Sequence, residues 1–105
     1  MNRVTFKILE AGTYAKIVRS KLPFSQLDGE TVVVQSQLPE SASLNDHLVW
    51  LWGILQNERR VLKNAAASGA TLQCECMASK GVISLFPNGA EMLHLLGVEL
   101  IIHTQ

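Results

Sequence analysis

Apolar residues recur along this chain with two periods, and the strongest helical pattern lies in its middle. At about 100° per residue, a continuous apolar stripe runs through Ser43–Ala67 and predicts one long helix, or two helices separated by a kink. The stripe consists of Leu44, Leu48, Leu51, Leu55, Leu62 and Ala66. A straight helix would also bury Glu58, whose unpaired carboxylate is costly to desolvate. We therefore expect a kink near Gln56–Asn57 that turns Glu58 outward.

Two tryptophans border this stripe on different sides. Trp50 and Trp52 are two residues apart and point about 200° apart on a helix, so they cannot both pack deeply against one sheet. We expect Trp52 to pack in the core and Trp50 to be half-covered by a loop. Alternatively, Trp50 forms with His47 and Ile54 an exposed aromatic anchor for a partner protein or a second subunit.

Alternation of apolar and polar residues predicts five strands. They are expected over Arg3–Leu9, Thr31–Gln37, Thr71–Ala78, Val82–Phe86 and Val98–His103. Two shorter helical patterns cover Thr13–Leu22 and Asn88–Leu96. Pro23–Gly29 is expected to be a loop with a turn at Asp28–Gly29, and Thr71–Phe86 to be an antiparallel hairpin.

The predicted order of elements is therefore β-α-β-α-β-β-α-β, in a single domain over residues 1–105. This order fits an α+β fold with a mixed, largely antiparallel five-stranded sheet and helices packed mainly on one face. A ferredoxin-like arrangement is one topology that satisfies it, because crossover connections and a hairpin are both present.

Composition and charge exclude several classes of protein. Apolar residues make up 48% of the chain and charged residues 17%, which is typical of a compact globular domain. The nine basic residues equal the nine acidic ones, which argues against a dedicated nucleic-acid binder. The chain has no apolar run long enough for a membrane span and no signal-peptide pattern at its start. We therefore expect a cytoplasmic protein without nucleic-acid or membrane partners.

Residues with chemical potential are few and poorly grouped. Cys74 and Cys76 share one face of a predicted strand, where free cysteines usually act as buried small apolar residues. Their spacing is not that of paired zinc ligands, and His94 is expected to face solvent. His47 is expected at the core margin, bonded to a backbone carbonyl, with no partner that would make it a base. We therefore predict no catalytic, cofactor-binding or metal-binding residues.

The second half of the chain resembles a family of small bacterial proteins known only as a domain of unknown function. The matching segments are Leu44–Leu51, Gly69, Thr71–Ala78, Val82–Phe86 and Leu95–Ile102. Members of that family often have a tryptophan in the strand before the helix, where this chain has Val33 or Val34. The resemblance implies a cytoplasmic bacterial α+β domain with no established activity, and similar small proteins serve as immunity proteins beside secreted toxins.

Outward positions of the predicted sheet, among them Met77 and Ile101, are more apolar than a solvated face requires. We therefore expect a non-enzymatic protein–protein interaction module, for example of the immunity type, that contacts its partner through His47, Trp50, Ile54, Met77 and Ile101. The alternative is a small-ligand binder or enzyme with a pocket between the sheet and helix 43–67, lined by His47, Tyr14 and Arg59. A homodimer is a third expectation. The sequence leaves open whether the chain is an enzyme, and the lack of grouped catalytic residues argues against it.

Overall fold

The computed structural model describes residues 1–104. Within them, the chain forms five strands and four α-helices, and a single 3₁₀ turn joins the second and third helices. The elements are β1 (Arg3–Leu9), α1 (Tyr14–Lys21), β2 (Ser25–Asp28), β3 (Thr31–Gln35), α2 (Leu44–Leu55), η1 (Gln56–Glu58), α3 (Arg59–Ala67), β4 (Thr71–Ala78), α4 (Pro87–Leu96) and β5 (Glu99–Thr104).

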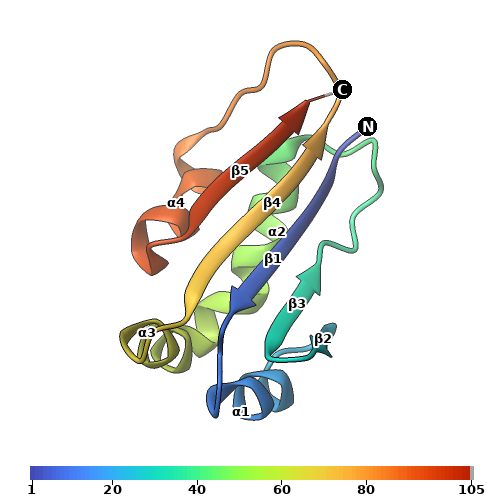
Figure 1. Ribbon diagram of the computed structural model, residues 1–105. Coiled ribbons are helices and arrows are strands. Elements are labelled where there is room, and N and C mark those ends of the chain that lie inside the picture. The colour runs from blue at the N-terminus through green and yellow to red at the C-terminus, as the bar shows by residue number, and fades with distance from the viewer. Residues whose placement is uncertain (105) are drawn as a thin grey trace.

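The strands form one sheet in the order β2-β3-β1-β4-β5 (Figure 1). All neighbouring pairs are antiparallel except β4 and β5, which run parallel. Strands β1 and β2 therefore run the same way with β3 between them, and β3 and β4 run the same way with β1 between them. These two interleaved split βαβ units are a ferredoxin-like arrangement, to which α4 and β5 add one further crossover and strand.

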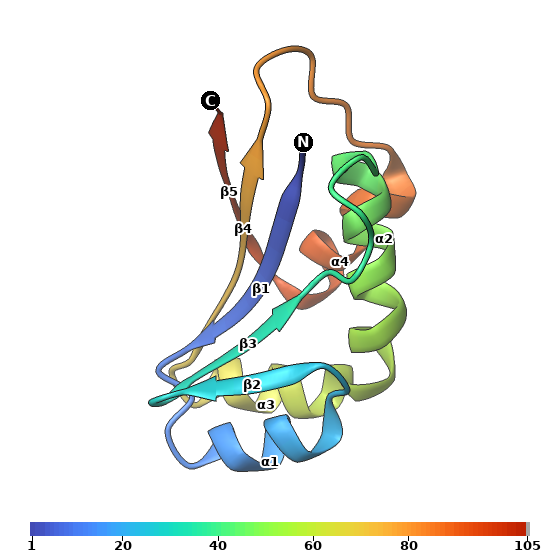
Figure 2. The same cartoon turned by 90° about the vertical axis from the view of Figure 1, so that its right-hand side faces the viewer.

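The helices cover one face of the sheet, as the sequence predicts, and α2 crosses it lengthwise (Figure 2). Buried leucines of α2 and α3, including Leu48, Leu51, Leu55 and Leu62, pack against Phe6 and other inward residues of the strands. Truncating one such leucine to alanine typically costs about 2–5 kcal/mol, so this contact defines the core. Within the described residues, no helix combines the length and hydropathy needed to cross a lipid bilayer.

The kink expected in the long helix is confirmed. The α-helical hydrogen bonding of α2 stops at Leu55, and the 3₁₀ turn at Gln56–Glu58 redirects the chain into α3. Glu58 is consequently half-exposed rather than buried. At the start of α2, the Asp46 amide donates to the Ser43 hydroxyl at 3.0 Å, which satisfies one of the free N–H groups of the first turn.

The fold class is confirmed, but the predicted order of elements is wrong in two places. Val82–Phe86 is an irregular connection and not a strand, so the hairpin expected over Thr71–Phe86 does not exist. The fifth strand is instead β2, within the segment Pro23–Gly29 that the sequence predicts as a loop. It forms a two-residue hairpin with β3, since Asp28 pairs with Thr31.

Candidate functional site

Two aromatic side chains meet on the surface beside α2. Phe24 lies in the turn between α1 and β2, and Trp50 lies on the outer side of α2. Their ring centroids are 5.6 Å apart with an interplanar angle of 51°, a tilted contact that aromatic rings favour. Trp50 is half-buried against the core, as expected, while Phe24 remains 59% exposed. We call Phe24 and Trp50 the aromatic pair.

The backbone of Phe24 is unusual for its residue type. Its φ angle is +62°, in the left-handed region. A side chain with a Cβ loses roughly 1–2 kcal/mol there relative to the right-handed conformation, and such strain is concentrated at functional sites. Next to it, the Ser25 hydroxyl donates to the carbonyls of Arg19 and Leu22. These bonds tie the turn that contains Phe24 to the end of α1.

The structure does not place His47 in an exposed anchor with Trp50. His47 is only 1% exposed and lies inside the core rather than at its margin. Its Nδ1 atom is 2.7 Å from the hydroxyl of buried Ser36, a side-chain partner that the sequence did not predict. Ile54 is half-buried against the core. Of the three residues expected on this rim, only Trp50 contacts another exposed aromatic ring.

The Ser36–His47 contact resembles the bond between a nucleophile and its base, but its surroundings point to a structural role. Both side chains are buried, and burial lowers the pKa of His47, an effect that the nearby Asp46 carboxylate and the Pro39 backbone only partly oppose. His47 Nε2 has no hydrogen-bond partner within residues 1–104, so no acid orients the ring as in a catalytic triad. The contact fixes the connection from β3 into α2.

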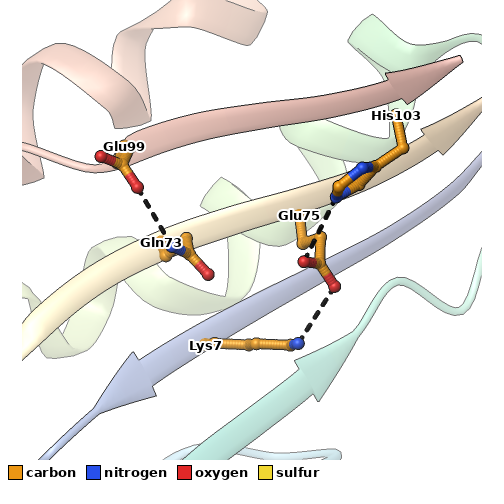
Figure 3. Close-up of polar contacts among 5 residues, drawn as sticks. All are labelled: Lys7, Gln73, Glu75, Glu99 and His103. Atoms are coloured by element: carbon orange, nitrogen blue, oxygen red, sulfur yellow. Dashed lines mark hydrogen bonds and ion pairs between the residues drawn. The ribbon is translucent and has the colours of Figure 1, made fainter.

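The helix-free face of the sheet holds a polar network (Figure 3). Lys7 Nζ donates to Glu75 Oε1 at 3.1 Å, and His103 Nε2 lies 3.4 Å from Glu75 Oε2. The hydrogen bond and the positive charge of Lys7 lower the pKa of the Glu75 carboxyl. One row along, Gln73 Nε2 donates to Glu99 Oε1 at 3.0 Å.

Met77 and Ile101 lie on this same face and are half-buried among those polar side chains. Ile101 is registered with Glu75, and Met77 with Arg3 on one side and His103 on the other. Both apolar residues therefore occupy the outward positions that the sequence predicts, separated by charged neighbours.

The cysteines and histidines that suggest a metal site do not converge. Cys74 and Cys76 point to the core from β4, and both are fully buried. Burial raises the pKa of Cys74, and it raises the pKa of Cys76 to about 12. His103 lies on the opposite face of the sheet and His94 on the exposed side of α4. No group of three or more potential metal ligands occurs in the part of the chain that the structure describes.

Two of the polar residues expected in a ligand pocket, His47 and Arg59, lie apart. His47 is in the first turn of α2 and Arg59 begins α3, twelve residues later, which corresponds to about 18 Å of helix. Tyr14 begins α1. The structure has a cleft of about 360 Å³ elsewhere, lined by Asn2, Ser43, Lys80, Val82, Ser84 and Phe86 among others.

Several exposed apolar residues were not singled out by the sequence pattern. Besides Phe24, they include Val82, which is 95% exposed, together with Phe86 and Ile102. Phe24 directly follows Pro23, and a large aromatic residue at the tip of a turn is a signal that could have been recognised. Ile102 lies on the helix-covered face, in register with buried Cys76, and the position of β5 at the sheet edge explains its exposure.

Comparison with known proteins adds no further information about this site. No protein-family model, no curated protein and no solved structure matches the chain. The resemblance to a bacterial family of unknown function therefore stays a prediction.

Proposed function

We propose that this chain is a non-enzymatic protein–protein interaction module that contacts its partner through the aromatic pair, Phe24 and Trp50. The observation that supports the proposal is the exposure of Phe24. A ring that is 59% exposed gains little from folding, yet the chain holds it there in a conformation that disfavours any residue with a Cβ. A partner that buries this ring would supply the hydrophobic stabilisation that the Phe24 side chain does not gain in the isolated chain.

The surroundings of the pair fit a contact surface. Trp50 is anchored against the core, so it presents a rigid edge that costs little entropy to bind. The elements on either side of the Phe24 turn each expose one more apolar side chain, Ile17 on α1 and Leu27 on β2. Tryptophan and other large aromatic residues are common among the residues that dominate interface energetics.

A pair of matched aspartate variants tests this proposal. Phe24→Asp and Val82→Asp both replace an exposed apolar side chain with the same charge, but only Phe24 belongs to the aromatic pair. A partner isolated from host lysate and then purified should bind the unmodified protein and Val82→Asp equally. Its affinity for Phe24→Asp should fall by tenfold or more, as for a central interface residue. Equal binding of all three proteins, or no specific partner, would contradict the proposal.

An immunity-type inhibitor in a bacterial cytoplasm is the specific form of this function that the sequence resemblance implies. It makes a narrower statement, that the partner is a secreted toxin and that binding blocks its activity. A gene for such a toxin beside the gene for this chain would support this form, and a partner of another kind would exclude it without affecting the broader proposal.

A small-ligand binder is the second candidate, and the observation that favours it is the cleft next to the start of α2. Its volume of about 360 Å³ is within the range of small-molecule sites. Asn2, Ser43, Ser79 and Lys80 supply polar groups there, on different segments from the residues first expected in a pocket. A ligand of this cleft should raise the melting temperature of the unmodified protein and lose its effect in Ser43→Trp, which would fill the space.

A further inference from the structure

The outer edge of β5 is an unprotected strand edge. Because β5 is last in the order β2-β3-β1-β4-β5, one side of its backbone has no strand partner within residues 1–104. Its six residues stay in unbroken register with β4, from Glu99 opposite Gln73 to Thr104 opposite Ala78. Natural edge strands are usually short, bulged, covered, or lined with proline or charged side chains, especially lysine. Strand β5, ELIIHT, is six residues long, has no proline or lysine, and carries one carboxylate, that of Glu99.

The core-side face of β5 is also incompletely covered. Val4, Cys76 and Ile102 form one row across the inner face of the sheet, and their exposed fractions are 1%, 0% and 36%. The first two are sealed by the helix layer, but Ile102 at the edge is not. A neighbouring strand beyond β5 would bury the side of Ile102 that now faces water.

The sequence of β5 is complementary to itself when it is read in the opposite direction. In an antiparallel pair of two β5 strands centred on Ile101, Glu99 of each copy lies opposite His103 of the other. Leu100 likewise lies opposite Ile102, and Ile101 opposite its own copy. Directly opposed apolar side chains on one face of such a pair interact favourably, and the Glu99 carboxylate can accept a hydrogen bond from the ring of His103. This register therefore matches every position from Glu99 to His103.

We infer that β5 is a homodimerisation strand, and that it pairs antiparallel with β5 of a second copy of this chain around a two-fold axis at Ile101. The axis is perpendicular to the sheet, so the two five-stranded sheets become one continuous sheet with both helix layers on the same side. Backbone hydrogen bonds supply the affinity, and the opposed side chains set the register.

The polar contacts of each copy leave room for this pairing. Glu99 accepts from Gln73 through Oε1, which leaves its second carboxylate oxygen able to accept another bond. His103 approaches Glu75 through Nε2, which leaves Nδ1 available for a second copy (Figure 3). In the dimer, His103 of one copy bridges its own Glu75 and Glu99 of the other. The contact thus extends an existing network without breaking it.

This inference does not depend on the proposed function. The aromatic pair includes Phe24, which precedes β2 at the opposite edge of the sheet from β5. A homodimer without any other partner would support the inference alone, and a partner bound through Phe24 by a monomeric chain would support the proposed function alone.

Two single-charge variants and their mixture test the dimer and its register. Sedimentation velocity over a concentration series should show that the unmodified chain dimerises. Glu99→Lys places a lysine opposite His103, and His103→Glu places two glutamates opposite each other, so each variant alone should dimerise roughly tenfold more weakly or not at all. In an equimolar mixture, both contacts of the heterodimer are attractive. The lysine introduced in one variant faces the glutamate introduced in the other, and the unchanged His103 faces the unchanged Glu99. The mixture should therefore recover dimerisation.

Glu91→Lys is the matched control, because it makes the same charge change on the exposed side of α4 and should leave dimerisation unchanged. Circular dichroism of each variant confirms that it is folded before the mixture is measured. A monomeric unmodified chain at every concentration overturns the inference. Dimerisation that both variants leave intact, or that the mixture fails to restore, overturns it equally, because the contact would then lie elsewhere or in another register.

Discussion

Gly89 lies directly against the side chain of Asn45. A Cβ atom on Gly89 would be 1.9 Å from Asn45 Oδ1, which is closer than any real contact. That oxygen accepts from the Phe86 amide at 2.9 Å, and Asn45 Nδ2 donates to Asn88 Oδ1 at 3.1 Å. The first turn of α2 is thereby joined to the start of α4 by a buried amide that fits only beside a glycine.

Replacing Gly89 with alanine should therefore destabilise the protein, although alanine is normally the better helix former. The methyl group would displace Asn45 and leave buried polar groups unpaired, at about 1–3 kcal/mol. Chemical denaturation should show this loss as a lower free energy of unfolding. Gly53→Ala is the control, since Gly53 is also inside a helix but has no atom within 4 Å of its added Cβ. It should gain up to about 1 kcal/mol. Two changes of the same sign would contradict this account.

Buried His47 should make the protein less stable in mild acid. Burial lowers its pKa in the folded state below the ordinary value of 6.5, so the unfolded chain binds the proton first as the pH falls. The free energy of unfolding is therefore unaffected by this group well above pH 6.5 and decreases below it. Urea denaturation at pH 7 and pH 5 measures the decrease.

His47→Gln provides the comparison for this pH effect. The variant keeps a polar side chain near Ser36 but cannot titrate, so its stability should change less between pH 7 and pH 5 than that of the unmodified protein. Glu75, whose pKa is also lowered, does not affect the comparison, because both proteins contain it. Identical pH dependence in the two proteins would show that His47 does not titrate as described.

Both cysteine thiols should be unreactive in the folded protein. Cys74 and Cys76 are fully buried, and burial raises the pKa of each thiol, that of Cys76 to about 12. Since the thiolate is the reactive form, a disulfide reagent at pH 8 should modify neither residue in buffer and both in denaturant. Rapid reaction of either thiol under native conditions would indicate that β4 opens or that its side chains face outward.

The left-handed backbone at Phe24 predicts an inverted order of two variants. Phe24→Ala and Phe24→Gly both remove the ring, but only alanine keeps the Cβ that disfavours a φ of +62°. The glycine variant should be more stable than the alanine variant by about 1 kcal/mol. At exposed Lys63 within α3, the same two substitutions should show the usual order, with alanine more stable than glycine by a similar amount. Thermal or chemical denaturation of all four variants tests this.

The local pattern of apolar and polar residues was sufficient to predict the helices and strands that bury one face. Strands β1 and β4 begin and end where alternation predicts, and α4 ends at Leu96, where the helical pattern ends, followed by Gly97 with a φ of +68°. The kink at Gln56–Glu58 follows from the cost of burying Glu58. In each case the deciding interaction lies within a few residues of the chain, so the sequence alone contains it.

The errors arise where distant segments compete. Val82–Phe86 has apolar residues at both odd and even positions, which favours a strand. However, β4 already pairs with β1 on one side and β5 on the other, so Val82–Phe86 cannot pair with it. Strand β2 is polar and lacks alternation, and its only signal was the turn at Asp28–Gly29, which is typical of a hairpin. Asn45 packs against a second helix, α4, and a helical wheel of α2 alone does not include that contact.

The candidate site was predictable only in part. Half-burial of Trp50 follows from its angle to Trp52, but the ring that covers it comes from Phe24, in a different element. His47 was expected at a margin because its partner, Ser36, precedes α2 and has no periodic relation to it. Contacts between a helix and an irregular segment leave no repeating signal in a sequence.

The shared register of Arg3 and His103 with Met77 has a consequence for connectivity. Both residues lie beside the same position of β4, so the two ends of the described chain are about two strand spacings, or roughly 10 Å, apart. A short tether could join them and make the backbone circular. Cutting that circle in the irregular connection between β4 and α4 would yield a permuted chain that starts with a crossover helix and keeps all four strand pairings.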